Sequence, residues 1–295
     1  MTVIGIFGPT ASGKSRVSEA VAQRIPAELV SADAMQVYEG LPVLTNQSPA
    51  RLSAIWPLGH EASLGEYAPL AHAAIDEILT AGKTPVVVGG TGLYFRAALA
   101  ELDLPPAPSE GARERWEAFY DAEGAETAHG RLWSLDPGAA AAVHANDRRR
   151  VVRALELAEA GSSLAPERDT LWAEETRHPT VIVGLDLPPA ALEARIEERT
   201  RAMFEQGVED EVARALAGPI STTARKTMGL DEISGLPREE AIQALIVRTR
   251  RYAAYQRKWM RRIPGLVIVD ADRPEGEIAD DIVNLARARE RLPRR

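Results

Sequence analysis

The sequence has 295 residues, of which 45% are apolar and 26% charged, so it can hold one large or two modest soluble domains. The absence of cysteine excludes disulfides, thiolate catalysis and cysteine-based zinc sites, and a net charge of −8 argues against a surface that is basic throughout. With no run of about 18 apolar residues and no leader-like start, we expect a cytoplasmic protein without a membrane span.

The N-terminal residues predict a phosphate-binding loop between a buried strand and a helix. Residues 3–7 are apolar, residues 8–15 read GPTASGKS, and apolar positions then recur at helical spacing as far as Pro26. The spacing G-x-x-x-x-G-K-[ST] wraps backbone N–H groups around an anion, with Lys14 as a point charge and the Ser15 hydroxyl as a magnesium ligand. The alternative is an ordinary glycine-rich turn. The loop alone does not say which phosphates it holds or what happens to them.

Strands and helices alternate through the first hundred residues. We expect strands at residues 3–7, 28–31 and 85–88, helices after the loop, at 67–81 and from about 93, and an irregular segment at 42–65 over the site. Because each strand is a continuous apolar run, the pattern predicts an α/β fold with a parallel sheet covered by helices on both faces.

The alternation stops at a proline-rich stretch, residues 102–108, which is typical of a domain boundary. Alanine-rich helical segments follow from residue 110 to about 173, and a buried strand returns at 179–185. Further helices are expected at 188–217 and 239–262, with a last strand at 265–269. The sequence therefore predicts a P-loop core in two parts, 1–104 and 179–295, interrupted by an all-helical insertion at 105–178.

Asp33 is the most informative carboxylate, because it follows the second strand of the predicted sheet. The carboxyl ends of parallel strands line one crevice, so Asp33 should lie beside the bound phosphate, where it could accept a proton or orient a nucleophile. The glycine-rich turn at residues 89–92 could bring the Thr91 hydroxyl to the same ligand. The alternative for Asp33 is an aspartate that caps a helix or stabilises a turn. The alternative for residues 89–92 is a glycine-rich turn that only allows close packing.

Two stretches are locally basic although the chain is acidic overall. Residues 148–150 read RRR with Arg153 nearby, and residues 241–269 contain no Asp or Glu but Arg248, Arg250, Arg251, Arg257, Lys258, Arg261 and Arg262. A basic stripe along the helix could neutralise a nucleic-acid backbone or a diphosphate. The alternative is a solvated face, although no acidic residue of that stretch can pair at i+4.

Five motifs, in this order, resemble those of the bacterial tRNA dimethylallyltransferases, also called tRNA isopentenyltransferases. They are residues 8–15 (GPTASGKS), 31–38 (SADAMQVY), 89–94 (GGTGLY), 146–156 (NDRRRVVRALE) and 248–261 (RTRRYAAYQRKWMR). The resemblance extends from residue 3 to about residue 270. It departs at Ala34, where a serine is usual, at residues 45–49 and at residues 229–232.

The resemblance implies transfer of a dimethylallyl group from dimethylallyl diphosphate to the exocyclic amine of the adenosine at tRNA position 37, 3′ of the anticodon. It implies that Asp33 accepts a hydrogen bond or proton from that amine and that Thr91 contacts the substrates. The implied diphosphate ligands are Gly8, Pro9, Thr10, Ala11, Ser12, Gly13, Lys14 and Ser15, with Ser15 also holding Mg²⁺. The residues implied to face the tRNA anticodon stem-loop are Asp33, Ala34, Met35, Gln36, Thr91, Arg113, Arg149, Arg150, Arg153, Arg257, Lys258 and Arg261.

Two other functions stay open from the residues alone. An adenylate isopentenyltransferase would use free nucleotide and would not need a helical insertion with an arginine run. A P-loop small-molecule kinase would use the same loop on ATP, with a basic lid and an acceptor pocket. We expect the protein to act as a monomer.

Overall fold

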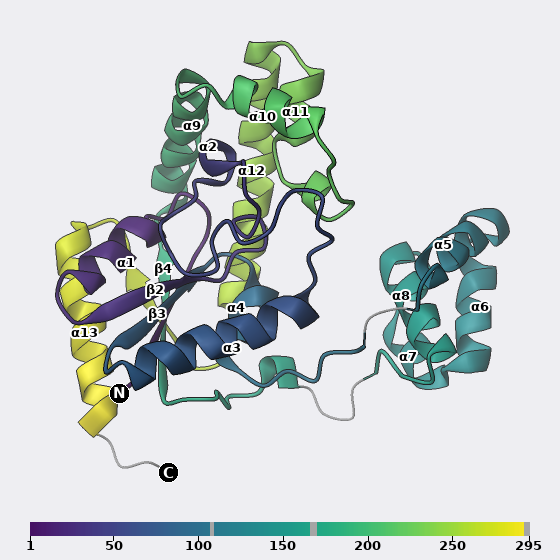
Figure 1. Ribbon diagram of the computed structural model, residues 1–295, viewed down its shortest axis with the longest axis horizontal. Coiled ribbons are helices and arrows are strands. Elements are labelled where there is room, and N and C mark those ends of the chain that lie inside the picture. The colour runs from purple at the N-terminus through teal and green to yellow at the C-terminus, as the bar shows by residue number, and fades with distance from the viewer. Residues whose placement is uncertain (107–108, 166–169, 292–295) are drawn as a thin grey trace. The chain divides into compact units, whose positions relative to one another are not determined.

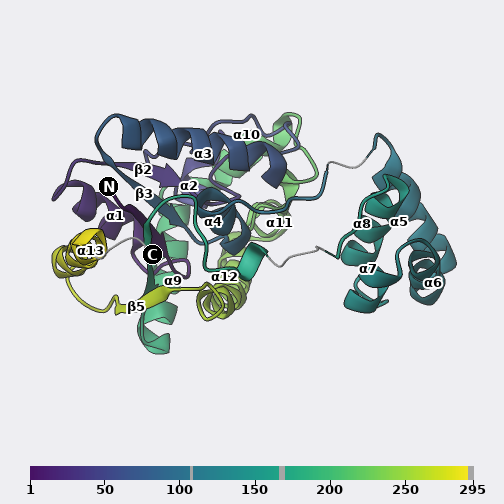
Figure 2. The same cartoon turned by 90° about the horizontal axis from the view of Figure 1, so that it is seen from below.

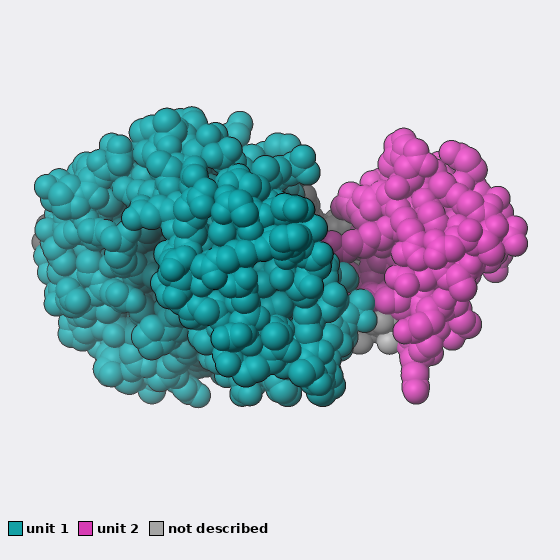
Figure 3. Space-filling model, turned by 90° about the horizontal axis from the view of Figure 1, so that it is seen from above, with its two compact units in different colours: residues 1–101, 171–295 teal, residues 102–170 magenta. Residues whose placement is uncertain are grey.

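The computed structural model describes residues 1–106, 109–165 and 170–291, and these fall into two compact units (Figure 3). Unit 1 comprises Met1–Glu101 and Leu171–Arg295, and unit 2 comprises Leu102–Thr170. The sequence prediction placed the insertion at residues 105–178, whereas the chain from Leu171 onward belongs to unit 1.

Unit 1 is built on a five-stranded parallel sheet. Its strands are β1 (Val3–Phe7), β2 (Ala27–Ser31), β3 (Thr84–Gly89), β4 (Thr180–Asp186) and β5 (Leu266–Asp270), in the spatial order β2-β3-β1-β4-β5. In the centre, Ile4 of β1 lies opposite Val86 of β3 and Val181 of β4. The predicted α/β fold is confirmed, because all four strand pairs are parallel.

Helices cover both faces of this sheet (Figure 1). The helices with the most extensive contacts to its strands are α1 (Lys14–Ala22), α3 (Leu64–Thr80), α4 (Gly92–Leu99) and α13 (Glu275–Arg291). Unit 1 also contains α2 (Pro42–Thr45), α9 (Pro189–Glu205), α10 (Val208–Ala217), α11 (Leu230–Gly235), α12 (Arg238–Met260) and a short 3₁₀ turn at Ala224–Lys226. A second 3₁₀ turn, Thr170–Trp172, spans the boundary between the two units in the sequence. Successive residues of a strand point to opposite faces, and β1 therefore supplies two cores. Ile4 and Ile6 pack in the core that includes α1 and α13, while Val3 and Phe7 pack in the core that includes α3 and α4 (Figure 2).

Unit 2 is entirely helical over the residues that the structure describes. It contains α5 (Ala112–Glu123), α6 (Ala125–Leu135), α7 (Pro137–Ala142) and α8 (Arg148–Glu159). Asp136 and Asp147 cap α7 and α8, because their carboxylates accept backbone N–H groups of the first turns. The core is small and alanine-rich, with Leu132 and Leu155 as its largest fully buried side chains.

Helix α13 was not predicted from the sequence. It packs against α1 and β4 and buries Ile278, Ile282 and Val283. Its buried residues Ile278, Ala279, Ile282, Val283 and Ala286 recur at helical spacing, so the sequence did carry a signal for this helix. Within the described part of the chain, no helix is both long and apolar enough to cross a membrane.

Candidate active site

Three strand ends meet at one edge of the sheet in unit 1. Phe7, which ends β1, lies opposite Gly89, which ends β3, and Ser31, which ends β2, lies opposite Val88. The phosphate loop follows β1, Asp33 follows β2 and Thr91 follows β3. The parallel register therefore brings the predicted anion site and both predicted polar side chains to the same edge.

The loop leaves the N-terminus of α1 open. Its last residue before the helix, Gly13, has φ of +90° and supplies no capping side chain. A Cβ on Gly8 would lie 2.9 Å from the Leu185 carbonyl oxygen, so glycine lets the loop approach β4. The Ser12 hydroxyl is buried and has no hydrogen-bond partner among the described residues. Free helix-terminal N–H groups and a spare hydroxyl form a site suited to an anion.

Two cations adjoin the loop. The Lys14 ammonium donates to the Pro9 carbonyl over 2.8 Å, and the Arg199 guanidinium of α9 donates to the Thr10 hydroxyl over 2.9 Å. The pKa of Lys14 is lowered to about 8, mainly by burial; the Asp33 carboxylate opposes this shift and the Arg199 charge adds to it. Burial also lowers the pKa of Arg199. A bound anion would relieve both penalties, because it favours the charged forms.

Backbone and hydroxyl groups orient the Asp33 carboxylate. Its Oδ1 accepts the Met35 N–H over 3.0 Å and faces the Thr91 hydroxyl at 3.4 Å. The same hydroxyl accepts the Ala34 N–H over 3.2 Å. The hydrogen bond from the Met35 N–H spans two residues, as in an Asx turn. The same carboxylate also lies beside Thr91, and its charge acts to raise the pKa values of Lys14 and Arg199.

Helix α12 contributes two residues, Gln256 and Tyr252, whose place beside the loop was not predicted. From the sequence, Gln256 was expected to face the tRNA and Tyr252 to lie in the core stripe of the helix. The Gln256 side chain accepts the Thr10 N–H over 2.7 Å and donates to the Gly90 carbonyl over 2.9 Å. Burial and the Asp33 charge raise the pKa of Tyr252, whereas Thr91 and Gln256, which lie near its hydroxyl, lower it. A signal was present, because Gln256 is a polar residue in line with the buried Thr249, Ala253 and Met260. Arg199 left no comparable signal among the many charged residues of α9.

The arginines of α12 do pair with acidic residues, which come from other elements. Arg248 pairs with Glu232 at 2.5 Å, and Arg250 with Glu193 at 3.7 Å. Arg257 pairs with Asp186 at 2.9 Å and so lies against the end of β4. Lys258 and Arg261 are exposed. The i+4 rule therefore identified too few partners for this helix, because it counts neighbours on the same helix alone.

The predicted tRNA-facing arginines of unit 2 form two groups. Arg113 and Arg153 both contact the fully buried Glu156 carboxylate, each at 2.9 Å. Arg149 and Arg150 lie exposed on the first turn of α8. In unit 1, Ala34, Met35 and Gln36 follow Asp33 directly, and the Gln36 amide donates to the Asn46 carbonyl over 3.0 Å.

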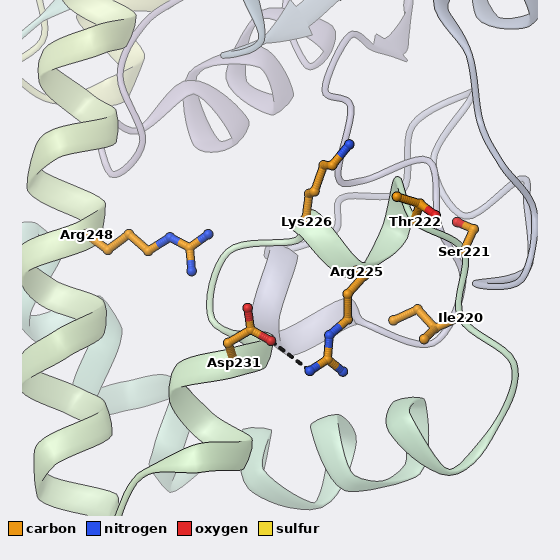
Figure 4. A pocket seen from close by; sticks show the side chains of 7 residues that line it. All are labelled: Ile220, Ser221, Thr222, Arg225, Lys226, Asp231 and Arg248. Carbon is orange, nitrogen blue, oxygen red and sulfur yellow. Dashed lines mark ion pairs between the residues drawn. The ribbon is translucent and has the colours of Figure 1, made fainter. Parts of the chain in front are cut away.

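Two cavities lie in unit 1. An open pocket of about 480 Å³ is lined by Ile220, Ser221, Thr222, Arg225, Lys226, Asp231 and Arg248 (Figure 4). Arg225 pairs with Asp231 at 2.8 Å across it. A narrow cavity of about 30 Å³ borders the loop at Thr10 and Ala11, with Arg199, Met203 and Met228 in its wall. Sequence reasoning missed both. The lining of the narrow cavity comes from distant segments, whereas the open pocket is lined by residues within 220–231 and by Arg248.

The chain matches the sequence signature of the family described as IPP transferase over residues 36–263 and that of isopentenyl transferase over residues 1–50. The tRNA dimethylallyltransferase of Corynebacterium jeikeium is 37% identical and covers 92% of this chain and 92% of its own. That of Thermobifida fusca is 39% identical and covers 93% of this chain and 91% of its own.

Solved structures show the same architecture. The full-length tRNA isopentenylpyrophosphate transferase of Bacillus halodurans is 30% identical, with a TM-score of 0.70 over 99% of this chain and 98% of its own. A eukaryotic dimethylallyltransferase, captured in crystallographic snapshots acting on tRNA, has a TM-score of 0.83 over 100% of this chain and 81% of its own. At 23% identity, that likeness concerns the fold alone.

Binding of inorganic diphosphate should raise the Lys14 pKa, because the anion stabilises the ammonium form. Since the pKa of Lys14 is about 8 without ligand, binding at pH 8 should take up about half a proton at this residue, and almost none at pH 6. Calorimetry in buffers of different ionisation enthalpy measures that uptake. Lys14→Arg is the control. Because arginine stays charged over this pH range, any proton uptake by this variant comes from diphosphate itself and is subtracted from that of wild type. Equal uptake by both proteins at pH 8 would contradict the assignment.

Proposed function

The chain belongs to the IPP transferase family, and on that premise we propose that it is a tRNA dimethylallyltransferase. It transfers a dimethylallyl group from dimethylallyl diphosphate to the exocyclic amine of the adenosine at tRNA position 37. One observation carries the proposal: Asp33 and Thr91 lie together beside the anion site formed by the loop and Lys14. A nucleophile and a phosphate leaving group could meet at this edge of the sheet.

The loop would stabilise the departing diphosphate. The bond between the allylic carbon and the diphosphate oxygen breaks, and the electron pair leaves with that oxygen. Lys14, Arg199 and the open N-terminus of α1 place positive charge where this negative charge develops, which is the main source of catalysis in such reactions.

The residues present suit magnesium bound mainly through the substrate. Ser15 offers a hydroxyl in the first turn of α1, and the described residues include no group of three or more His, Asp or Glu that could hold the ion alone. Magnesium commonly binds through few protein ligands together with phosphate oxygens. Bound there, it would add charge stabilisation to the leaving diphosphate.

Asp33 would serve the nucleophile. The adenine amine is weakly basic, so positive charge builds on its nitrogen as the new carbon–nitrogen bond forms. The carboxylate, held by the Met35 N–H and the Thr91 hydroxyl, can stabilise that charge and accept the proton that the nitrogen loses. The base must leave its stack to reach this edge, as in other enzymes that act on a base.

The tRNA backbone would meet local basic surfaces despite the net charge of −8. Arg149 and Arg150 on α8 and Lys258 and Arg261 on α12 are exposed and suited to phosphate contacts. Arg113 and Arg153 would act in part by keeping α5 and α8 together through Glu156. The pocket that contains Lys226 offers a further basic surface on unit 1.

The isopentenyl transferase match at residues 1–50 favours one alternative, prenylation of free adenylate. Labelled dimethylallyl diphosphate, supplied with unmodified tRNA, AMP or ATP in separate reactions, separates the two functions. We expect label in tRNA and none in the free nucleotides. Label in AMP but not in tRNA would favour the alternative and leave the exposed arginines of α8 without a role.

Replacing Asp33 with Asn should lower the single-turnover rate by about 10² to 10⁴, since a positioned general base is lost. The affinities for donor and tRNA should change less than about twofold, because the interaction is made mainly in the transition state. Asp270→Asn is the control, since Asp270 ends β5 at the same edge of the sheet. An equal loss of binding and rate in Asp33→Asn would make the residue a substrate-positioning group.

Replacing Arg149 and Arg150 together with Ala should make tRNA binding less dependent on salt. Each lost phosphate contact reduces the slope of log affinity against log salt by about 0.7 to 0.9. Filter binding across a salt series measures this slope. Arg115→Ala is the control in the same unit, because Arg115 already pairs with Glu159 at 2.5 Å. An unchanged slope in the double variant would mean that these arginines face solvent in the complex.

A further inference from the structure

One side chain joins the two halves of the candidate active site. Gln256 lies on α12, with 1% of its surface exposed, and reaches the edge of the sheet between the loop after β1 and the turn after β3. Its amide oxygen accepts the Thr10 N–H, and its amide nitrogen donates to the Gly90 carbonyl. Thr10 belongs to the diphosphate loop, and Gly90 directly precedes Thr91, which holds Asp33.

The two bonds define the orientation of the amide. A backbone N–H can only donate and a carbonyl can only accept, so the side-chain oxygen must face Thr10 and its nitrogen must face Gly90. Among side chains of this length that are uncharged at neutral pH, only glutamine carries a donor and an acceptor at the same carbon. The arrangement therefore needs glutamine at this position.

Gly90 lies too close to the Gln256 amide to carry a side chain. A Cβ on Gly90 would lie 2.2 Å from the Gln256 amide nitrogen and 3.3 Å from the Gly8 carbonyl oxygen. The loop, the turn and the glutamine are thus in direct contact, and a shift of Gln256 must move one of them. Tyr252, one turn earlier on α12, lies near both Gln256 and Thr91.

We propose that Gln256 is a positioning residue for prenyl transfer, which sets the separation between the diphosphate in the loop and the amine at Asp33. The inference rests on the proposed function, since it assigns the leaving group to the loop and the nucleophile to the turn. Gln256 touches neither substrate in this account and acts through the Thr10 and Gly90 backbones. Misplacement of reacting groups by about 1 Å can cost about 10² in rate, so a modest displacement suffices for a large effect.

Gln256→Met tests the proposal, because methionine has a similar volume and makes neither hydrogen bond. We expect the single-turnover rate at saturating donor and tRNA to fall by about 10². Donor and tRNA affinities should stay within about threefold, because the loop and the basic surfaces still form. Gln243→Met is the matched control, since Gln243 lies exposed on the same helix and bonds Glu239 alone.

Gln256→Glu provides a second variant with a distinct signature. The carboxylate can still accept the Thr10 N–H but repels the Gly90 carbonyl, whereas the protonated acid can donate to it. The ratio of its rate to that of wild type should therefore rise as the pH falls from 8 to 6. Other titratable groups lie near the loop in both proteins, so their effect on the rate cancels in this ratio. They are Lys14, Asp33, Arg199 and Tyr252.

The outcomes separate the two hypotheses. If wild type transfers no label to tRNA, the proposed function fails whatever the variants do. If wild type transfers label to tRNA, two results for Gln256→Met overturn the positioning role. One is a single-turnover rate equal to that of wild type, and the other is a loss of donor affinity with no loss of that rate. Thermal unfolding of each variant is measured alongside, and rates are expressed per folded molecule. Should Gln256→Met not fold, a flat pH ratio for Gln256→Glu overturns the proposal.

Discussion

The parallel register of β2, β3 and β1 is the constraint on which the candidate active site depends. Because these strands end level with one another, the segments that follow them open onto the same edge of the sheet. The phosphate loop, Asp33 and Thr91 are far apart in the sequence, yet each is the first polar feature after a buried strand. A slip of one residue in any pair would turn the strand's apolar side chains away from their core, so packing of the two cores also holds the site in place.

Two cations, Lys14 and Arg199, adjoin the loop, and this arrangement favours an anion. Burial disfavours the charged forms of Lys14 and Arg199, and the nearby Asp33 carboxylate offsets this in part. A diphosphate would offset much more, which couples donor binding to protonation of Lys14. The same principle resolves the apparent conflict between an acidic protein and a polyanionic partner: the arginines of α8 and the cations at the end of α12 are local, whereas the net charge is global.

The parts of the site that the sequence predicted are those set by local pattern. Apolar runs marked β1 and β3, and the shorter apolar pair Leu29-Val30 marked β2; the residues after these strands could be placed because parallel strands share an edge. Arg199 and Gln256 could not be found in this way, since each is defined by its contact with Thr10, 189 and 246 residues away. The acidic partners of the α12 arginines escaped for the same reason, because tertiary contacts decide them. Helix α13 could have been predicted, since its buried residues recur at helical spacing. Assignment of the tRNA-facing residues stays a prediction.

The central claim is that leaving group and nucleophile meet at this edge of the sheet. A crystal structure with an anticodon stem-loop and a non-reactive thiodiphosphate analogue of the donor tests it most directly. The account predicts the diphosphate within hydrogen-bond distance of the Lys14 ammonium and the loop N–H groups, and the exocyclic amine of the flipped adenine within hydrogen-bond distance of the Asp33 carboxylate. A diphosphate bound away from the loop, or an adenine whose amine faces a group other than Asp33, would contradict it.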